Sequence, residues 1–432
     1  MSFVTGLNQR YFDGGLSQAT LDLLAPIDNE RPDVRRLVER MCRQFQRAKL
    51  PATDFSEALA WITGFFLPKI LPGAWGGSVP PITQKGRHSA IDDYLARNPW
   101  RPLRDGDRLL DLGCGFPPVT TLDTAERFPQ VSIKGADPAL GKYLVRDANG
   151  DYAVFDDGFG LIYFQAGAVD IVRWQALYDD PRATAERFLS ELKALLPGMP
   201  ADDGRLGRIA GDGFELVRNP AAEFERQNVS LEKVGFGTPG FSGFAAARCF
   251  NVLYYFDENF REEALAWLGD VLVDGGIFVS GGNWSRSRYA RYSVHQNQQG
   301  TLVPREFAFS IENLRPLELV AVFALHDVDH DLDLLTTLIG ILRSDTSFCR
   351  DVDRRMDEIQ DEIGFCARNA DGYLASIREG TDPAILNSAA DVIGSALERE
   401  GFPERAVAIL EREGYRAWIN CVGHVAIDPA RL

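Results

Sequence analysis

The most specific chemical signal in this sequence is a glycine-rich turn, DLGCG at residues 111–115. An apolar run precedes the turn, and residues 117–128 after it have the spacing of a helix. Glycines in such a turn accept positive φ angles and let the backbone approach a ligand closely. Backbone N–H groups there, and at the start of a helix, can bind an anionic group. We therefore expect Asp111, Gly113 and Gly115 to bind a small charged ligand.

The residues around the two glycines distinguish between two kinds of nucleotide ligand. A dinucleotide site has the fingerprint G-x-G-x-x-G, whose third glycine allows close packing of helix and strand. Pro118 stands at that third position. Asp111 would repel a pyrophosphate but attract an ammonium group. S-adenosylmethionine carries an ammonium, a carboxylate and a sulfonium, so the Asp-x-Gly-x-Gly spacing favours this cofactor over a nicotinamide dinucleotide.

A second acidic residue, Asp137, ends the next expected strand, residues 131–136. A carboxylate at this place accepts hydrogen bonds from ribose hydroxyls in nucleotide-binding sheets. Asp111 and Asp137 would then lie at the carboxyl ends of neighbouring strands, where open α/β sheets bind their ligands. The alternative is that the glycines only turn the chain. It leaves the agreement of strand, turn, helix and second acid unexplained.

With these motifs, residues 100–310 resemble the class I S-adenosylmethionine-dependent methyltransferases, whose first motif is similar to DLGCG. Within them, residues 213–284 resemble the methyltransferases that esterify glutamates on chemotaxis receptors. In that family a strand similar to NVLYYF, residues 251–256 here, is followed by a helix and an Asp-Gly-Gly turn. The resemblance implies an α/β fold with a Rossmann-like sheet, S-adenosylmethionine as cofactor, and methyl transfer as the activity.

The same resemblance implies roles for individual residues. Asn228, with Val229, would lie against the adenine, and Asn251 would lie at the sheet edge near the cofactor. Tyr255 would flank the methyl group, where an aromatic ring favours the sulfonium cation. The arginine that the family has before its Asn-Val pair is Phe250 in this chain.

Methyl transfer from a sulfonium is an in-line displacement, which the enzyme promotes by holding the nucleophile, methyl and sulfur in line. A base is needed only if the nucleophile arrives protonated. His88 and Tyr255 are the candidate catalytic residues. Arg87 is the candidate substrate-binding residue, because a guanidinium can hold an acidic substrate bidentately. The alternatives are that His88 is a solvated loop histidine and Arg87 a surface charge.

The segment HDVDHDLD, residues 326–333, packs six side chains of metal-ligand types into a short span. Histidines at i and i+4 can face one metal on a helix, but the segment lacks the partner motif of a metalloenzyme. Asp and His also suit the start of a helix. We therefore expect an acidic helix entry before Leu332 and no metal site. The six cysteines are scattered, which favours reduced thiols over zinc or disulfides.

Three regions would position these residues. Residues 1–100 and 331–432 have mostly helical spacing, whereas residues 101–330 alternate between strands and helices. Such alternation is typical of a mostly parallel sheet. Residues 140–205 interrupt it as an insertion that begins with an Asn-Gly hairpin signal. The insertion and the helical flanks would form a lid that shields the sulfonium from water.

Further strands are expected over residues 223–229 and 244–254. Two late runs, near 291–296 and 301–309, are expected as antiparallel strands at the edge of the sheet. The fold class is therefore α/β, with a mostly parallel Rossmann-like sheet, an antiparallel edge, and helical additions at both ends.

The composition limits the partners. The chain has 432 residues and a formal net charge of −16, which argues against a large nucleic-acid interface. No apolar run is long enough to cross a bilayer. The N-terminal residues lack the pattern of a secretory signal, so the expected location is cytoplasmic. Exposed helical flanks are compatible with a homodimer.

From these observations we predict a methyltransferase that uses S-adenosylmethionine to methylate oxygen or nitrogen on a small molecule or a peptide side chain. The alternative is a catalytically silent scaffold or interaction protein that binds the cofactor. The retained glycines and acids argue against it. Pro118 argues against a third reading, a nicotinamide oxidoreductase.

Overall fold

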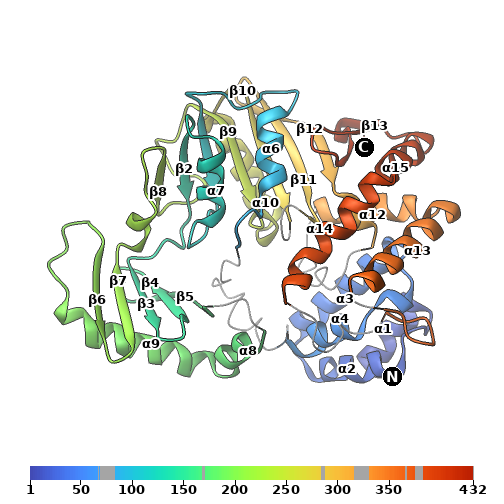
Figure 1. Ribbon diagram of the computed structural model, residues 1–432, viewed down its shortest axis with the longest axis horizontal. Coiled ribbons are helices and arrows are strands. Elements are labelled where there is room, and N and C mark those ends of the chain that lie inside the picture. The colour runs from blue at the N-terminus through green and yellow to red at the C-terminus, as the bar shows by residue number, and fades with distance from the viewer. Residues whose placement is uncertain are drawn as a thin grey trace.

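The structure is a computed structural model, and it describes residues 1–66, 68, 83–167, 171–283, 288–315, 330–364, 367–374 and 383–431. Two sheets organise the fold (Figure 1). The larger has nine strands in the order β13-β14-β12-β11-β10-β9-β1-β2-β8, and the smaller has five in the order β5-β4-β3-β7-β6.

Five neighbouring strands of the main sheet run parallel, as expected for an α/β fold. They are β8 (Val229–Glu232), β2 (Ser132–Ala136), β1 (Arg108–Leu112), β9 (Phe244–Phe250) and β10 (Leu272–Gly282). Helix α7 (Val119–Arg127) follows β1, and α10 (Glu258–Val271) follows β9. Leu109 packs on the side of α7 and Leu110 on the side of α10, because successive side chains of a strand point to opposite faces. The carboxyl ends of these strands therefore meet at one edge between the helix layers.

Antiparallel strands extend the main sheet beyond β10. The expected pair is confirmed as β11 (Arg291–Gln298) and β12 (Thr301–Phe309). A C-terminal hairpin, β13 (Ala417–Ile419) and β14 (Val425–Ile427), then adds to β12. The antiparallel part is thus wider than a single edge strand, because the end of the chain returns to the sheet.

The second sheet is wholly antiparallel and lies between β2 and β8 in the sequence. Its strands are β3 (Tyr143–Asp147), β4 (Tyr152–Phe155), β5 (Leu161–Gln165), β6 (Gly207–Gly211) and β7 (Phe214–Arg218). Helices α8 (Ile171–Asp179) and α9 (Pro181–Leu195) follow β5, and α9 packs on the sheet. We call this unit, residues 143–218, the inserted sheet. It extends past residue 205 because β7 pairs with β3 along its whole length.

Two of the expected strand boundaries are wrong. The strand expected over residues 223–229 is absent, since Pro220–Glu223 forms a 3₁₀ turn and β8 begins only at Val229. Strand β9 ends at Phe250, before the expected residue 254, because Asn251 adopts a left-handed conformation with φ of 60°. Both boundaries affect the positions of predicted site residues.

Helices from the two ends of the chain pack against each other beside the antiparallel strands (Figure 1). The N-terminal helices in this group are α1 (Phe3–Phe12), α2 (Gln18–Leu24), α3 (Pro32–Arg47) and α4 (Glu57–Trp61). Helix α6 (Ser89–Arg97) packs instead on the main sheet beside α7. The C-terminal helices are α12 (His330–Leu342), α13 (Thr346–Glu362), α14 (Pro383–Arg399) and α15 (Phe402–Arg412). Thr336 donates to the Gln44 side chain at 2.8 Å, and Arg47 pairs with Asp333 at 2.6 Å. The two terminal regions therefore share one core.

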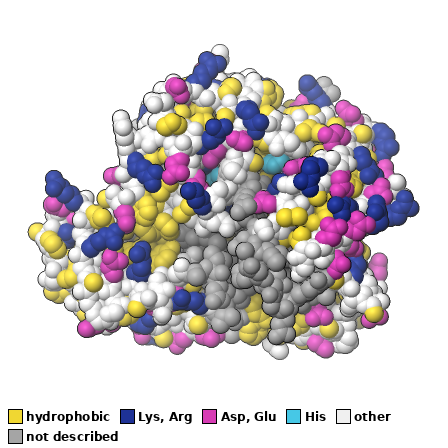
Figure 2. Space-filling model, viewed as in Figure 1, with side chains coloured by type: hydrophobic (Ala, Val, Ile, Leu, Met, Phe, Trp, Pro, Cys, Tyr) yellow, Lys and Arg dark blue, Asp and Glu magenta, His cyan; other side chains and the backbone are white. Residues whose placement is uncertain are grey.

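The surface is mixed in charge. On the face shown in Figure 2, basic and acidic side chains are interspersed, and the basic ones form no continuous field there. In the part of the chain that the structure describes, every helix is too short or too polar to cross a membrane.

Candidate functional site

The turn after β1 requires glycine at both expected positions. Gly113 has a φ of 71° and Gly115 a φ of 68°, a region that other residues rarely adopt. A Cβ atom at Gly113 would meet Cγ2 of Val252 at 2.3 Å, so the turn lies directly against the residues that follow β9. The N–H of Gly113 donates to the carbonyl of Ala136 at 2.8 Å, which ties the turn to the end of β2.

Asp137 lies at the carboxyl end of β2, beside the turn. One carboxylate oxygen accepts the N–H of Gly115 at 2.7 Å, and the other accepts the N–H of Ala139 at 2.7 Å. Burial raises the pKa of Asp137, and the two backbone hydrogen bonds act in the opposite direction. Each carboxylate oxygen has a further lone pair, so the group can still accept hydroxyl hydrogens. The arrangement fits the ribose of a nucleotide ligand.

Asp111 has a protein partner that the motif alone did not reveal. Nε and Nη2 of Arg248 donate to the two oxygens of Asp111 at 2.8 and 2.7 Å, and Thr121 donates to the same carboxylate at 2.6 Å. Nη1 of Arg248 donates to Asp92 at 2.7 Å, and burial raises the pKa of Asp92 to about 6. The contact expected between Asp111 and a ligand ammonium would have to compete with this buried ion pair. The sequence signal for Arg248 was a charged residue inside an otherwise apolar strand.

Asn251 and Arg87 meet through Asn283, which the sequence reading missed. The side-chain amide of Asn251 donates to Oδ1 of Asn283 at 3.1 Å, and the N–H of Asn283 donates to Oδ1 of Asn251 at 3.1 Å. The Asn283 amide donates to the Arg87 carbonyl at 2.8 Å, and Nη2 of Arg87 donates to the Asn283 carbonyl at 2.8 Å. This reciprocal pairing fixes Arg87 at the carboxyl ends of β9 and β10, where Asn251 and Asn283 lie.

His88 is buried, so the solvated-loop alternative is wrong. Its ring lies 5.1 Å from that of Phe250, and its Nδ1 has no hydrogen-bond partner among the described residues. Burial lowers the pKa of His88 well below its ordinary value, and the charges of Arg248 and Arg87 lower it further. The imidazole is therefore neutral at neutral pH, and the same burial and neighbouring cations oppose its protonation.

Tyr255 lies on a 3₁₀ turn, Leu253–Tyr255, just beyond β9. Its ring centroid is 4.6 Å from that of Tyr254. Burial raises the pKa of Tyr255 well above its ordinary value, and the charge of Arg87 acts in the opposite direction. The hydroxyl is therefore protonated at neutral pH, beside the predicted substrate arginine.

Asn228 and Val229 are not brought to the glycine turn. The Asn228 amide donates to the carbonyls of Ala125 and Phe128 at 3.2 and 3.4 Å, at the end of α7. Val229 pairs with Ile133 near the amino end of β2, four residues before Asp137, which corresponds to roughly 13 Å along a strand. It is the other end of β8 that reaches Asp137, where the carbonyl of its last residue, Glu232, accepts the Asp137 N–H at 3.2 Å. The geometry therefore gives no support to the adenine contact that the family resemblance implied for Asn228 and Val229.

The acidic segment at residues 326–333 is described only from His330 onward, and residues 326–329 lie outside the described residues. His330 is 3.6 Å from Glu258 at the surface, and Asp331 accepts a hydrogen bond from Ser293 at 2.8 Å. Among the residues that the structure describes, no group of three or more His, Cys, Asp and Glu side chains is placed to hold a metal ion.

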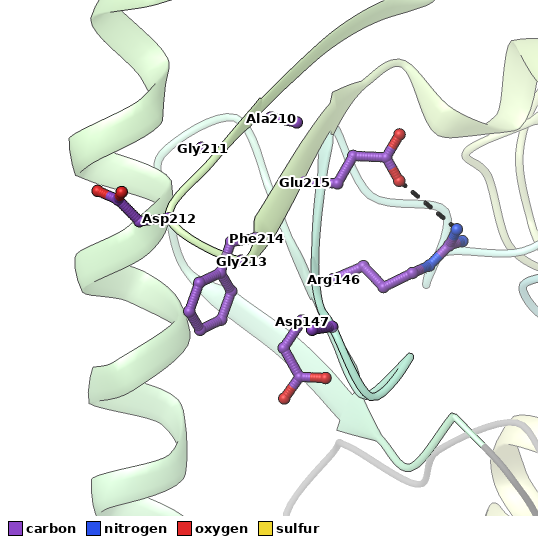
Figure 3. A pocket seen from close by; sticks show the side chains of 9 residues that line it. Arg146, Asp147, Ala210, Gly211, Asp212, Gly213, Phe214 and Glu215 are labelled. Carbon is purple, nitrogen blue, oxygen red and sulfur yellow. Dashed lines mark ion pairs between the residues drawn. The ribbon is translucent and has the colours of Figure 1, made fainter.

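Two clefts lie on or beside the inserted sheet. One, of about 440 Å³, lies between the β3–β4 and β6–β7 turns, where Arg146 and Glu215 point toward each other with their charged atoms 3.6 Å apart (Figure 3). None of its lining residues belongs to the glycine turn or to the Asn251 region. The other, of about 270 Å³, is lined by Leu140 and Leu231, close to the carboxyl ends of β2 and β8. Neither cleft is lined by a predicted cofactor residue. The second lies nearer to them, because the N–H of its lining residue Leu140 donates to the Asp137 carbonyl at 3.3 Å.

No protein-family model and no curated protein matches the sequence. Among solved structures, PKMT2 from Rickettsia typhi in complex with AdoHcy is 13% identical with a TM-score of 0.22, over 47% of this chain and 26% of that chain. A putative O-methyltransferase from Nostoc punctiforme PCC 73102 is 10% identical with a TM-score of 0.23, over 74% of this chain and 59% of that chain. This chain spans less than two thirds of the length of either protein. Likenesses this distant do not assign an activity to it.

Proposed function

We propose that this protein is an S-adenosylmethionine-dependent methyltransferase. The observation that carries the proposal is the 2.7 Å hydrogen bond from the Gly115 N–H to the Asp137 carboxylate. It joins the glycine turn of one parallel strand to the acid that ends the next strand, at the edge where α/β sheets bind nucleotides. Asn251, which follows the neighbouring strand β9, lies at the same edge. Arg87 lies there too, because it is hydrogen-bonded to Asn283 at the end of β10.

Asp137 would hold the ribose hydroxyls, and the backbone of Gly113 to Gly115 would lie closest to the rest of the cofactor. Asn251 would lie beside the cofactor at the same edge of the sheet. Asp111 would act through Arg248 by fixing the end of β1 beneath the turn. When bound, S-adenosylmethionine supplies an electrophilic methyl group on a sulfonium.

The residues beside this edge suit a nucleophile on a small molecule or a peptide side chain. Arg87 would orient an anionic substrate. His88 would be the base for an alcohol or ammonium nucleophile, although its lowered pKa makes it a weak one. Tyr255 would flank the methyl group. Residues 101–330 would form the catalytic domain, with the inserted sheet and the helical regions 1–100 and 331–432 around it.

A catalytically silent cofactor-binding protein is the second candidate. The pairing of Asp111 with Arg248 favours it, because that pairing engages the carboxylate expected to attract the ligand ammonium. The two candidates share cofactor binding and differ in methyl transfer. Incubation with labelled methyl donor and a panel of alcohols, amines, carboxylates and peptides would separate them.

The first test is calorimetric titration of the full chain with S-adenosylmethionine and S-adenosylhomocysteine. We expect micromolar binding by the wild type. Asp137→Ala should abolish it, because the ribose hydroxyls lose their acceptor. Asp137→Asn keeps the volume and one acceptor, and should weaken binding less. Absence of binding by a folded wild type would contradict the proposal and favour an unrelated binding role.

A further inference from the structure

The glycine turn is fixed from two sides. On the main-sheet side, the Gly115 N–H donates to Asp137. On the other side, the carbonyl of Phe116 accepts the hydroxyl of Tyr163 at 3.1 Å and that of Tyr152 at 3.4 Å. Tyr152 and Tyr163 belong to strands β4 and β5 of the inserted sheet. The insertion therefore makes direct hydrogen bonds to the turn that the proposed function assigns to the cofactor.

The non-glycine side chains of the turn strengthen this contact. Cys114 and Phe116 are buried in a cluster with apolar side chains of the inserted sheet. Its other members are Leu140, Leu144, Val154, Tyr163 and Val217. The ring of Phe116 also lies edge-on to that of Phe224, 5.6 Å away. The turn thus packs on the inserted sheet through Cys114 and through Phe116, which directly follows it.

Successive side chains on the strands of the inserted sheet point to opposite faces, so the sheet contacts the turn with one face and helix α9 with the other. Leu144, Val154 and Val217 face the turn. Their neighbours face α9, where they pack with Phe188 and Leu192. These neighbours are Val145, Ala153, Phe155 and Leu216. The sheet therefore packs on its helix with one face while its other face contacts the turn.

The hydroxyl of Tyr163 is suited to donate this hydrogen bond at any physiological pH. Its side chain is buried, and burial, followed by Tyr152 and Asp137, raises the pKa of Tyr163 well above its ordinary value. The hydroxyl stays protonated over the whole physiological range and can donate to the Phe116 carbonyl. That carbonyl is buried beneath the inserted sheet, so loss of the donors would leave it unsatisfied.

We propose that Tyr163, assisted by Tyr152, is a positioning residue for the cofactor turn, and that the inserted sheet and the cofactor site are one coupled unit. The inference rests on the proposed function. A turn already fixed between Asp137 and the tyrosines loses less conformational freedom when a ligand binds. By the same coupling, a ligand held by the turn and Asp137 stabilises the inserted sheet.

The test compares Tyr163→Phe and Tyr152→Phe with the control Tyr143→Phe, all in the full chain. Tyr143 lies on β3 of the same sheet, and its ring lies tilted against that of Phe159, with the centroids 5.6 Å apart, rather than against the turn. Without ligand, hydrogen exchange of a peptide covering residues 110–123 should be faster in Tyr163→Phe than in the wild type and the control. Tyr152→Phe, which removes the longer hydrogen bond, should show a smaller increase.

With S-adenosylhomocysteine as the probe, calorimetry should give a Kd raised roughly three- to tenfold in Tyr163→Phe and unchanged in Tyr143→Phe. The probe should also slow exchange in residues 152–165 more in the wild type than in Tyr163→Phe, a difference that a merely structural tyrosine would not produce. Unchanged exchange of the turn in Tyr163→Phe and Tyr152→Phe would overturn the positioning role, whether or not the probe binds. Probe binding without protection of residues 152–165 would overturn the coupling, whereas failure of the wild type to bind the probe contradicts only the proposed function.

Discussion

The guanidinium of Arg248 on β9 binds the carboxylate of Asp111 on β1 through two hydrogen bonds of 2.8 and 2.7 Å. Arg248 is fully buried and Asp111 is nearly so. The positive charge of Arg248 thus compensates the negative charge of Asp111 inside the protein, and Arg248 also pairs with Asp92 from α6. This relationship connects the carboxyl end of β1 to helix α6, and it makes the role of Asp111 testable.

We expect Arg248→Met to cost about 3–5 kcal/mol of unfolding free energy, because Asp111 and Asp92 would remain buried without a counter-charge. The triple variant Arg248→Met, Asp111→Leu, Asp92→Asn should recover much of that loss, since an apolar replacement of a buried ionic group is often tolerated. Urea denaturation measures both. If Asp111 acts only through Arg248, a folded triple variant also retains S-adenosylhomocysteine binding. Complete loss of that binding at full stability would assign Asp111 to the ligand directly.

Gly113→Ala and Gly106→Ala form a matched pair at the two ends of β1. Both glycines have positive φ, 71° and 83°, so alanine at either position costs about 1–2 kcal/mol of backbone strain. A Cβ at Gly106 meets no atom within 4 Å, whereas at Gly113 it meets Val252 at 2.3 Å. Gly113→Ala should therefore destabilise more and weaken cofactor binding, while Gly106→Ala leaves binding unchanged. Addition of Val252→Ala should relieve the clash at Gly113 but not the strain, and equal effects of the two single variants would contradict the assigned geometry.

Asn251 combines a left-handed backbone with two hydrogen bonds to Asn283. Asn251→Gly removes the hydrogen bonds but suits the φ of 60°, whereas Asn251→Ala removes the hydrogen bonds and adds strain. We expect Asn251→Ala to be less stable than Asn251→Gly by about 1 kcal/mol in urea denaturation. The opposite order would show that the left-handed conformation is not maintained in solution.

His424 should make stability depend on pH. It is buried against Tyr292, and burial lowers its pKa to about 3, with the charge of Arg288 adding to the effect. Between the ordinary histidine pKa of about 6.5 and the folded value, the unfolded chain binds a proton that the folded chain does not. The stabilising contribution is thus complete above about pH 6.5 and is lost as the pH falls toward the folded pKa.

The measurement is the slope of unfolding free energy against pH between pH 6 and pH 5. In His424→Gln this slope should be smaller than in the wild type by about 1 kcal/mol per pH unit. The comparison of slopes removes any uniform loss of stability in the variant. Asp92, whose pKa burial raises to about 6, acts with the opposite sign but is common to both proteins. Identical slopes would show that His424 titrates normally.

The local pattern of the sequence determined the elements that hold the proposed cofactor. The strand, glycine turn and helix around Gly113 and Gly115 follow from residues adjacent in the chain. The same is true of Asp137 at the end of the next strand and of the Asn149-Gly150 hairpin in the inserted sheet. Such features depend on hydrophobic periodicity and on glycine φ angles, which short segments fix by themselves.

The tertiary structure alone decided which of these residues have partners and which reach the site. Arg248 pairs with Asp111 across 137 positions, and Asn283 fixes Arg87 across 196 positions. Asn228 and Val229 lie at the amino end of β8, away from Asp137, because β8 starts later than its sequence pattern indicated. Strand order, register and strand ends result from packing between distant segments, and a local pattern carries no record of which distant segment will be the neighbour.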